Sequence, residues 1–116
     1  MTEITPNVET DRTRVFIEWR NIGSGDTVTA IDISQFSDKT VHVFGTFDGS
    51  TINMLGSNDT SKTEWFPLVD PQGTAISFSS NGGEVILENT RFIKPDPASL
   101  GASTDITVAI CAKRSV

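Results

Sequence analysis

The chain contains few residues of the kinds that perform catalysis. Its only histidine is His42 and its only cysteine is Cys111. A single histidine excludes the multi-histidine zinc sites, and any Ser-His-Asp triad would have to be built around it. Cys111 has no partner for an internal disulfide, and its apolar neighbours Val108 and Ile110 indicate a strand in which it is a small buried hydrophobic residue. We therefore expect no catalytic residue at either position.

Acidic side chains are the remaining candidates for chemistry. Glycoside hydrolysis needs two carboxylates that flank a cleft, and the chain offers Glu18, Glu64, Glu84 and Glu88. A small domain with short turns has little material for a deep pocket. Oxygen ligands suited to calcium stand near turns at Asp48, Asn58, Asp59 and Asp70. They lack the close spacing of a calcium loop, so we expect no enzyme, no metal and no cofactor.

A carbohydrate site is the most specific binding chemistry that the residues offer. Sugar sites on β-sandwiches place an aromatic platform beside convergent hydrogen-bonding groups, and Trp65 with Asn58 and Asp59 has these components. The alternative is that Trp65 belongs to the core, because it lies in a strand pattern with Phe66 and Leu68. Alternation requires one of the two aromatic residues to face inward, and the sequence leaves open which one does.

Length and charge limit the classes of partner. The 116 residues fit one domain, which would bury roughly two-thirds of its unfolded surface. Nine Lys and Arg residues against fifteen Asp and Glu residues give a net charge of −6. This balance disfavours a partner that is nucleic acid, since phosphate neutralisation needs basic residues. No apolar run has the length of a signal peptide or of a membrane span, so we expect synthesis in the cytoplasm and no membrane partner.

The sequence pattern predicts that short β-strands position these residues. Val41, Val43 and Gly45 alternate with residues of the other face, and Asp48-Gly49 supplies the positive φ angles of a two-residue turn. The chain would then return through residues 52–56. The sequence therefore predicts a β-hairpin here.

Two other strands have clear inward faces. The segment 13–20 places Val15, Ile17 and Trp19 on one face and Phe16 on the other, and the segment 104–112 alternates in the same way. Weaker patterns predict strands at 27–33, 75–79 and 84–87. A short apolar run at 91–94 is expected to stop at Pro95, because proline donates no ladder hydrogen bond, and 95–103 is expected to be a loop.

Taken together, the patterns predict an all-β fold. About eight short strands, turn signals every eight to twelve residues and no helical window favour an antiparallel β-sandwich or jelly roll. Parallel pairing is disfavoured, because no connection has room for a crossover helix. We expect an N-terminal arm at residues 1–12, which is polar and without periodicity, and a single β-sandwich domain at residues 13–116.

A family resemblance adds to this interpretation. The run from Gly45 to Gly73 contains a G-x-x-x-G segment, a strand, G-S-N-D, an aromatic strand and a D-P-Q-G turn. It is followed at residues 88–95 by E-N-T-R-F-I-K-P and later by a closing hydrophobic strand. Over residues 40–112 the chain resembles small virion proteins of tailed bacteriophages, in particular head decoration (cement) proteins with a β-sandwich fold.

The resemblance implies a structural protein of the virion at the capsid surface. Its partners would be the major capsid protein and further copies of itself in a homotrimer, and many weak contacts would add through multivalency. Hydrophobic Phe16 and Phe44 would be candidates for the subunit interface, unless a loop of the same chain covers them. The polar arm, with Thr2, Glu3 and Ile4, would reach a neighbour or stay disordered. The alternative function is a carbohydrate- or receptor-binding module of a phage particle.

Overall fold

The computed structural model describes residues 2–115, and this part of the chain contains twelve β-strands, joined by turns and loops, and no helix. Met1 and Val116, at the outer ends of the predicted arm and domain, lie outside the described residues. Within that range no helix is long and apolar enough to cross a membrane. The longer strands are β3 (Arg14–Ile22), β6 (Phe36–Thr46), β7 (Thr51–Ser57), β11 (Phe92–Ala98) and β12 (Asp105–Arg114). The shorter ones are β1 (Glu3–Ile4), β2 (Asn7–Thr10), β4 (Thr27–Val28), β5 (Ile31–Asp32), β8 (Phe66–Pro67), β9 (Ser77–Phe78) and β10 (Gly82–Ile86).

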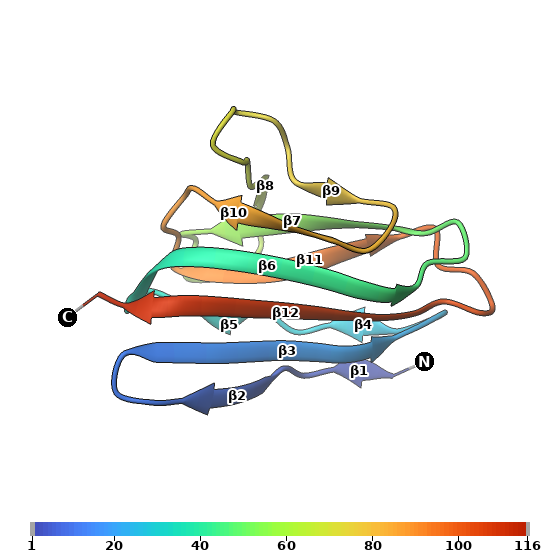
Figure 1. Ribbon diagram of the computed structural model, residues 1–116, viewed down its shortest axis with the longest axis horizontal. Coiled ribbons are helices and arrows are strands. Elements are labelled where there is room, and N and C mark those ends of the chain that lie inside the picture. Colours follow the sequence, from blue (N-terminus) through green and yellow to red (C-terminus); the bar gives the residue numbers. More distant parts are fainter. Residues whose placement is uncertain (1, 116) are drawn as a thin grey trace.

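The strands form two main antiparallel sheets. The first sheet has the order β10-β6-β12-β3-β2, and the second has the order β5-β11-β7-β8, with β9 also paired to β7. Figure 1 shows β3, β12 and β6 as neighbouring long strands, with β11 passing behind β6. The predicted all-β, antiparallel fold is confirmed. One short pair departs from it, because β1 lies parallel to β4.

One apolar core joins the two sheets. The alternation predicted for β3 and β12 is confirmed, because Val15, Ile17 and Trp19 on β3 are buried, as are Ile106, Val108 and Ile110 on β12. The second sheet contributes Ile52, Met54 and Ile93 to the same cluster. The indole nitrogen of Trp19 donates a 2.7 Å hydrogen bond to the Thr29 carbonyl, so this large ring is buried with its polar atom satisfied.

The predicted hairpin between β6 and β7 is wrong. Asp48 and Gly49 do adopt positive φ angles, 49° and 79°. The strands on either side belong to different sheets, however, since β6 pairs with β12 and β10 while β7 pairs with β11. The Asp48 carboxylate accepts a 3.0 Å hydrogen bond from the Ser103 amide of the loop before β12, which ties the two crossing loops together. Asp48 and Gly49 therefore predicted correctly that the chain turns, but they did not predict which strand pairs with β6.

The predicted stop at Pro95 is also wrong. Strand β11 continues through Pro95 and Pro97 to Ala98 and pairs with β7 along its whole length. Because the two prolines are two residues apart, their missing N–H groups fall on one side of the strand. Strand β11 has β7 along one edge. Along its other edge, only Phe92 and Ile93 pair with another strand, which is β5. The prolines therefore cost no ladder hydrogen bond.

The N-terminal residues differ from the expected arm. Strand β2 pairs with β3 from Asn7 to Thr10 and forms one edge of the first sheet. Strand β1 pairs with β4, and Ile4 packs against the core. Backbone hydrogen bonds require no apolar periodicity, which is why the sequence pattern gave no sign of these strands.

Candidate interaction face

The surface of the first sheet that points away from the core is the best candidate for a functional site. We call it the outer face and define it by two rows of residues that lie opposite one another across the five strands. One row is Glu9, Phe16, Cys111, Thr40 and Val85, and the other is Asn7, Glu18, Ala109, His42 and Gly83. Each row takes one residue from each strand, so the outer face is a continuous patch built on a rigid element.

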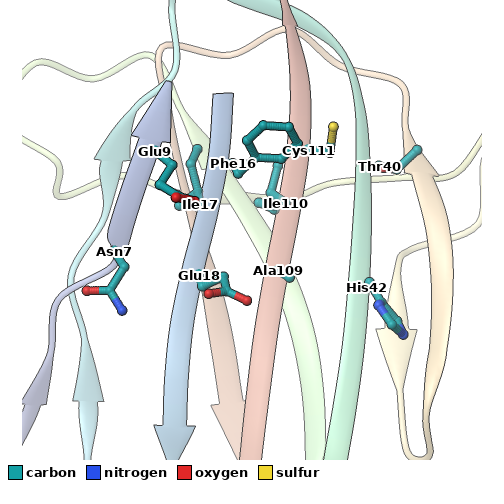
Figure 2. A pocket seen from close by; sticks show the side chains of 10 residues that line it. All are labelled: Asn7, Glu9, Phe16, Ile17, Glu18, Thr40, His42, Ala109, Ile110 and Cys111. Atoms are coloured by element: carbon teal, nitrogen blue, oxygen red, sulfur yellow. The ribbon is translucent and has the colours of Figure 1, made fainter. Parts of the chain in front are cut away.

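A shallow groove of about 740 Å³ runs over the outer face. Its floor is low because the middle strand, β12, carries the small residues Ala109 and Cys111 there. Phe16 stands beside this floor on β3 and is 41% exposed. Figure 2 shows Phe16 next to Cys111, and His42 across Ala109 from Glu18. An exposed aromatic ring beside small residues makes this groove a candidate contact site.

The borders of the groove are polar. Glu18 accepts a 2.8 Å hydrogen bond in its ion pair with Arg20, and both side chains are solvent-exposed, so the pair adds little stability. The His42 ring lies 4.8 Å from the ring of Phe44, which extends the aromatic surface along β6. An apolar centre with a polar rim matches the anatomy of protein interfaces.

The structure brings together only some of the residues predicted for an interface. Phe16 and Phe44 both lie on outward positions of the first sheet, although Phe44 is half-buried. Thr2, Glu3 and Ile4 lie elsewhere, beside β4: the Thr2 amide donates to the Asp26 carboxylate at 3.3 Å, and Ile4 packs on the core. These N-terminal residues are therefore not part of the outer face.

The sequence interpretation missed the contribution of β12. Cys111 was expected to be buried, but it is half-exposed on the outer face, as is Ala109. The sequence did contain a signal for this exposure. Because Ile106, Val108 and Ile110 point inward, alternation along the strand requires Ala109 and Cys111 to point outward. His42 likewise alternates with the buried Val41 and Val43.

The residues predicted for a sugar site hold a loop in place. The Asp59 carboxylate accepts hydrogen bonds from the Ser61, Thr63 and Glu64 amides and from the Thr63 hydroxyl. The Asn58 side-chain oxygen accepts a 2.9 Å hydrogen bond from the Arg91 amide. Both acceptors are thus engaged by the protein itself, and they do not converge on a free space.

Trp65 and Phe66 do not follow the expected alternation. Neither ring is buried: Trp65 is half-buried and Phe66 is 40% exposed, while the inward position is taken by Leu68. The Trp65 indole donates to the Lys62 carbonyl at 2.9 Å, and the Lys94 ammonium lies 4.4 Å from the ring centre. Strand β8 is only two residues long, so a continuous alternation does not extend back to Trp65.

Titration of Asp59 provides a test of this loop. The Thr63 hydroxyl, followed by the three backbone amides, lowers the pKa of Asp59 from 3.8 to about 2. A lowered pKa means that the contribution of this carboxylate to stability is present above pH 3.8 and is lost as the pH falls through about 2. We expect an NMR titration of the Asp59 side chain to have its midpoint near 2. A midpoint near 3.8 would contradict the loop geometry, and Asp59→Asn provides the assignment control.

Among residues 2–115 no three His, Cys, Asp or Glu side chains gather in a way that could hold a metal ion. Asp48 binds the loop before β12 through the Ser103 amide, and the Asp70 carboxylate accepts hydrogen bonds from Gln72 and Thr74 within its own turn. Turn structure accounts for these acidic side chains.

Comparisons with known proteins place the chain in no family. No family model matches it, and no curated protein matches it. Among solved structures, the protein NMB1881 from Neisseria meningitidis is similar over 95% of this chain and 83% of its own chain, with 11% sequence identity and a TM-score of 0.39. A likeness at that TM-score carries no argument about function.

Proposed function

We propose that the two sheets form a jelly roll. The strand order supports this: β3, β5, β6, β7, β8, β10, β11 and β12, numbered one to eight along the chain, lie in the orders 1-8-3-6 and 2-7-4-5. The first of these strands therefore pairs with the eighth, the second with the seventh, the third with the sixth and the fourth with the fifth, all antiparallel. Such nested pairing corresponds to two Greek keys in two sheets.

On this fold, the proposed function is that of a structural protein of a tailed-bacteriophage virion, which decorates the head shell and bridges neighbouring subunits of the major capsid protein. The observation that carries it is the open outer face, where a shallow groove of mixed polar and apolar lining has the exposed Phe16 ring beside it. Jelly rolls serve as viral capsid domains and as lectins, and a bridging protein needs a rigid contact face more than a pocket.

The outer face is assigned to the contact between copies in a homotrimer. Closed rings form from heterologous contacts, in which one patch of each copy meets a different patch of the next. A trimer then presents three copies of its capsid-binding surface at once, so that weak individual contacts add through effective concentration. This keeps the exposed Phe16 ring out of water in the assembled particle.

Phe16→Ser tests this assignment. We expect wild-type protein to be a trimer by light scattering and to co-sediment at a fixed ratio with heads that lack it. Loss of the Phe16 ring should cost about 2 kcal/mol at each contact, which weakens each contact about 30-fold. Phe66→Ser is the matched control, because Phe66 is exposed to the same extent, 40%, but lies on the second sheet. A wild-type monomer that ignores heads would contradict the proposed function.

The alternative, a carbohydrate- or receptor-binding module of a phage particle, keeps one supporting observation. Trp65 and Phe66 are consecutive in the sequence at the edge of the second sheet, and both are at least partly exposed. Because Asn58 and Asp59 are engaged by backbone amides, a sugar would have to bind these rings through other polar groups. Binding on a glycan array that is lost in Trp65→Ala would favour this alternative.

A further inference from the structure

Strand β2 forms an open edge of the first sheet. Within residues 2–115 its one strand partner is β3, and Figure 1 shows it at the border of the molecule with no strand beyond it. All its residues are exposed, and it contains neither proline nor lysine. Natural edge strands use these two residue types to prevent pairing with another chain. This edge is therefore accessible to an added strand.

The backbone groups on the open side of β2 belong to Val8 and Thr10. At the end of the β2–β3 ladder, the Asp11 amide donates to the Arg14 carbonyl at 3.0 Å. In an antiparallel ladder, alternate residues direct both of their backbone groups to the partner strand. The residues two and four positions before Asp11 therefore bond to β3, while the N–H and C=O groups of Val8 and Thr10 point away from it. Such groups are the template for strand addition.

Val8 also brings an uncovered apolar side chain to this edge. It lies opposite Ile17 of β3, on the side of the sheet that faces the core. Ile17 is buried, but Val8 is 48% exposed, so the second sheet does not extend over β2. An apolar residue on a strand laid beside β2 would lie next to Val8 and remove part of its side chain from water.

We propose that the added strand is β2 of a second copy of this chain, antiparallel to the first and related to it by a two-fold axis at Val8. The edge is self-complementary about this residue. Val8 meets Val8 of the second copy, and on each side of the axis Asn7 lies opposite Glu9, so that a side-chain amide donates to a carboxylate. Backbone hydrogen bonds join the two Val8 residues and link each Thr10 amide to the Pro6 carbonyl of the other copy.

The charge on β2 selects this register over its neighbour. The neighbouring register pairs Val8 of one copy with Thr10 of the other and uses the same free backbone groups. It places the two Glu9 carboxylates directly opposite each other, which is destabilising. A two-fold contact requires a surface that matches itself, and β2 meets this condition only with Val8 at the axis.

Edge pairing would continue the first sheet from one copy into the next, so that two outer faces lie side by side. It leaves Phe16 and the small residues of β12 uncovered, and it is therefore independent of the trimer contact proposed above. A pair of four-residue strands is a small interface. We expect it to be weak in dilute solution and to join one trimer to the next where many copies are held close together.

Disulfide trapping tests the pairing and its register. In the full-length chain with Cys111→Ser, which removes the native thiol, Val8→Cys places two thiols at the axis with Cα atoms about 5.5 Å apart. Glu9→Cys is the matched control, because the same axis leaves its Cα atoms more than about 7 Å apart, beyond the reach of a disulfide. We expect Val8→Cys to form linked dimers at least about tenfold faster under mild oxidation. Equal rates, or a faster reaction of Glu9→Cys, would overturn the proposal.

A proline at the axis tests the contact without a cross-link. Val8→Pro removes an N–H group that points to the open side, so β2 keeps its pairing with β3 and only the edge loses a donor. Phe16→Ser provides the background, because it weakens the outer-face contact.

In sedimentation velocity, we expect Phe16→Ser protein to form dimers as its concentration rises. Adding Val8→Pro should shift dimer formation to concentrations at least about tenfold higher, because each copy loses a backbone hydrogen bond. Unchanged urea unfolding would show that the double variant keeps its fold. Phe16→Ser protein that stays monomeric up to about 1 mM would exclude edge pairing. The wild-type oligomer in the same experiment tests the proposed trimer separately.

Discussion

Replacement of Trp19 by alanine is expected to lower the free energy of unfolding by about 3–5 kcal/mol. Trp19 is completely buried in the core that both sheets share, and its indole nitrogen donates to the Thr29 carbonyl at 2.7 Å. The variant loses the apolar contacts of the ring, leaves a cavity and leaves this carbonyl without its donor. A domain of ordinary stability, about 5–15 kcal/mol, would lose a large part of it.

Urea unfolding followed by circular dichroism measures this loss without depending on tryptophan fluorescence. Trp65→Ala is the matched control, because Trp65 is half-buried on the surface and its ring contacts the Lys94 ammonium. We expect it to cost about 1 kcal/mol or less. Equal losses in the two variants would contradict the placement of Trp19 at the centre of the core.

Gly45→Ala is expected to cost more than about 3 kcal/mol, because conformational strain and a steric collision add at this position. Gly45 has a φ angle of 137°, which side-chain-bearing residues rarely adopt. An added Cβ would collide with the backbone of Asp105 and lie 3.0 Å from the Cα of Ile106 on the neighbouring strand β12. Backbone atoms held in a ladder cannot move aside as a flexible side chain can.

Gly49→Ala is the control for the conformational part of this effect. Gly49 also has a positive φ angle, 79°, but an added Cβ there meets no atom within 4 Å. We expect a cost of about 1–2 kcal/mol, measured by the same urea titration. If Gly45→Ala cost no more than Gly49→Ala, the close approach of β6 to β12 at Gly45 would be wrong.

The strands that the sequence predicted best are those with one fully buried face. Val15, Ile17 and Trp19 on β3 alternate over several residues with polar neighbours, and this pattern survives in the structure because one face meets the core. Strand β2 escaped prediction because all four of its residues are exposed at a sheet edge. The strand predicted at residues 91–94 ended too early, because Pro95 was expected to stop it. The missing N–H group of Pro95 faces the edge of β11 that has no strand partner there, so β11 continues through this residue.

The candidate site was only partly accessible to sequence reasoning. Phe16 was placed correctly on an outward face by alternation. The groove depends in addition on Ala109 and Cys111, which come to lie beside Phe16 and Glu18 only through the pairing of β12 with β3. The predicted sugar residues Asn58 and Asp59 are adjacent in sequence, but backbone amides engage both side chains: amides of its own loop bind Asp59, and the distant Arg91 amide binds Asn58.

The sequence by itself determined the inward faces of long strands such as β3 and the change of direction at Asp48-Gly49. Both depend on neighbours a few positions away: the period of two along a strand and the φ angles that these two turn residues allow. Only the tertiary structure decided which strands pair. The turn at Asp48-Gly49 joins two sheets rather than two neighbours, because β6 pairs with β12 and β10 while β7 pairs with β11, and the two sheets share one core. The same long-range choice brings Lys39 within 2.8 Å of Asn89, fifty positions away, a contact that no local pattern contains.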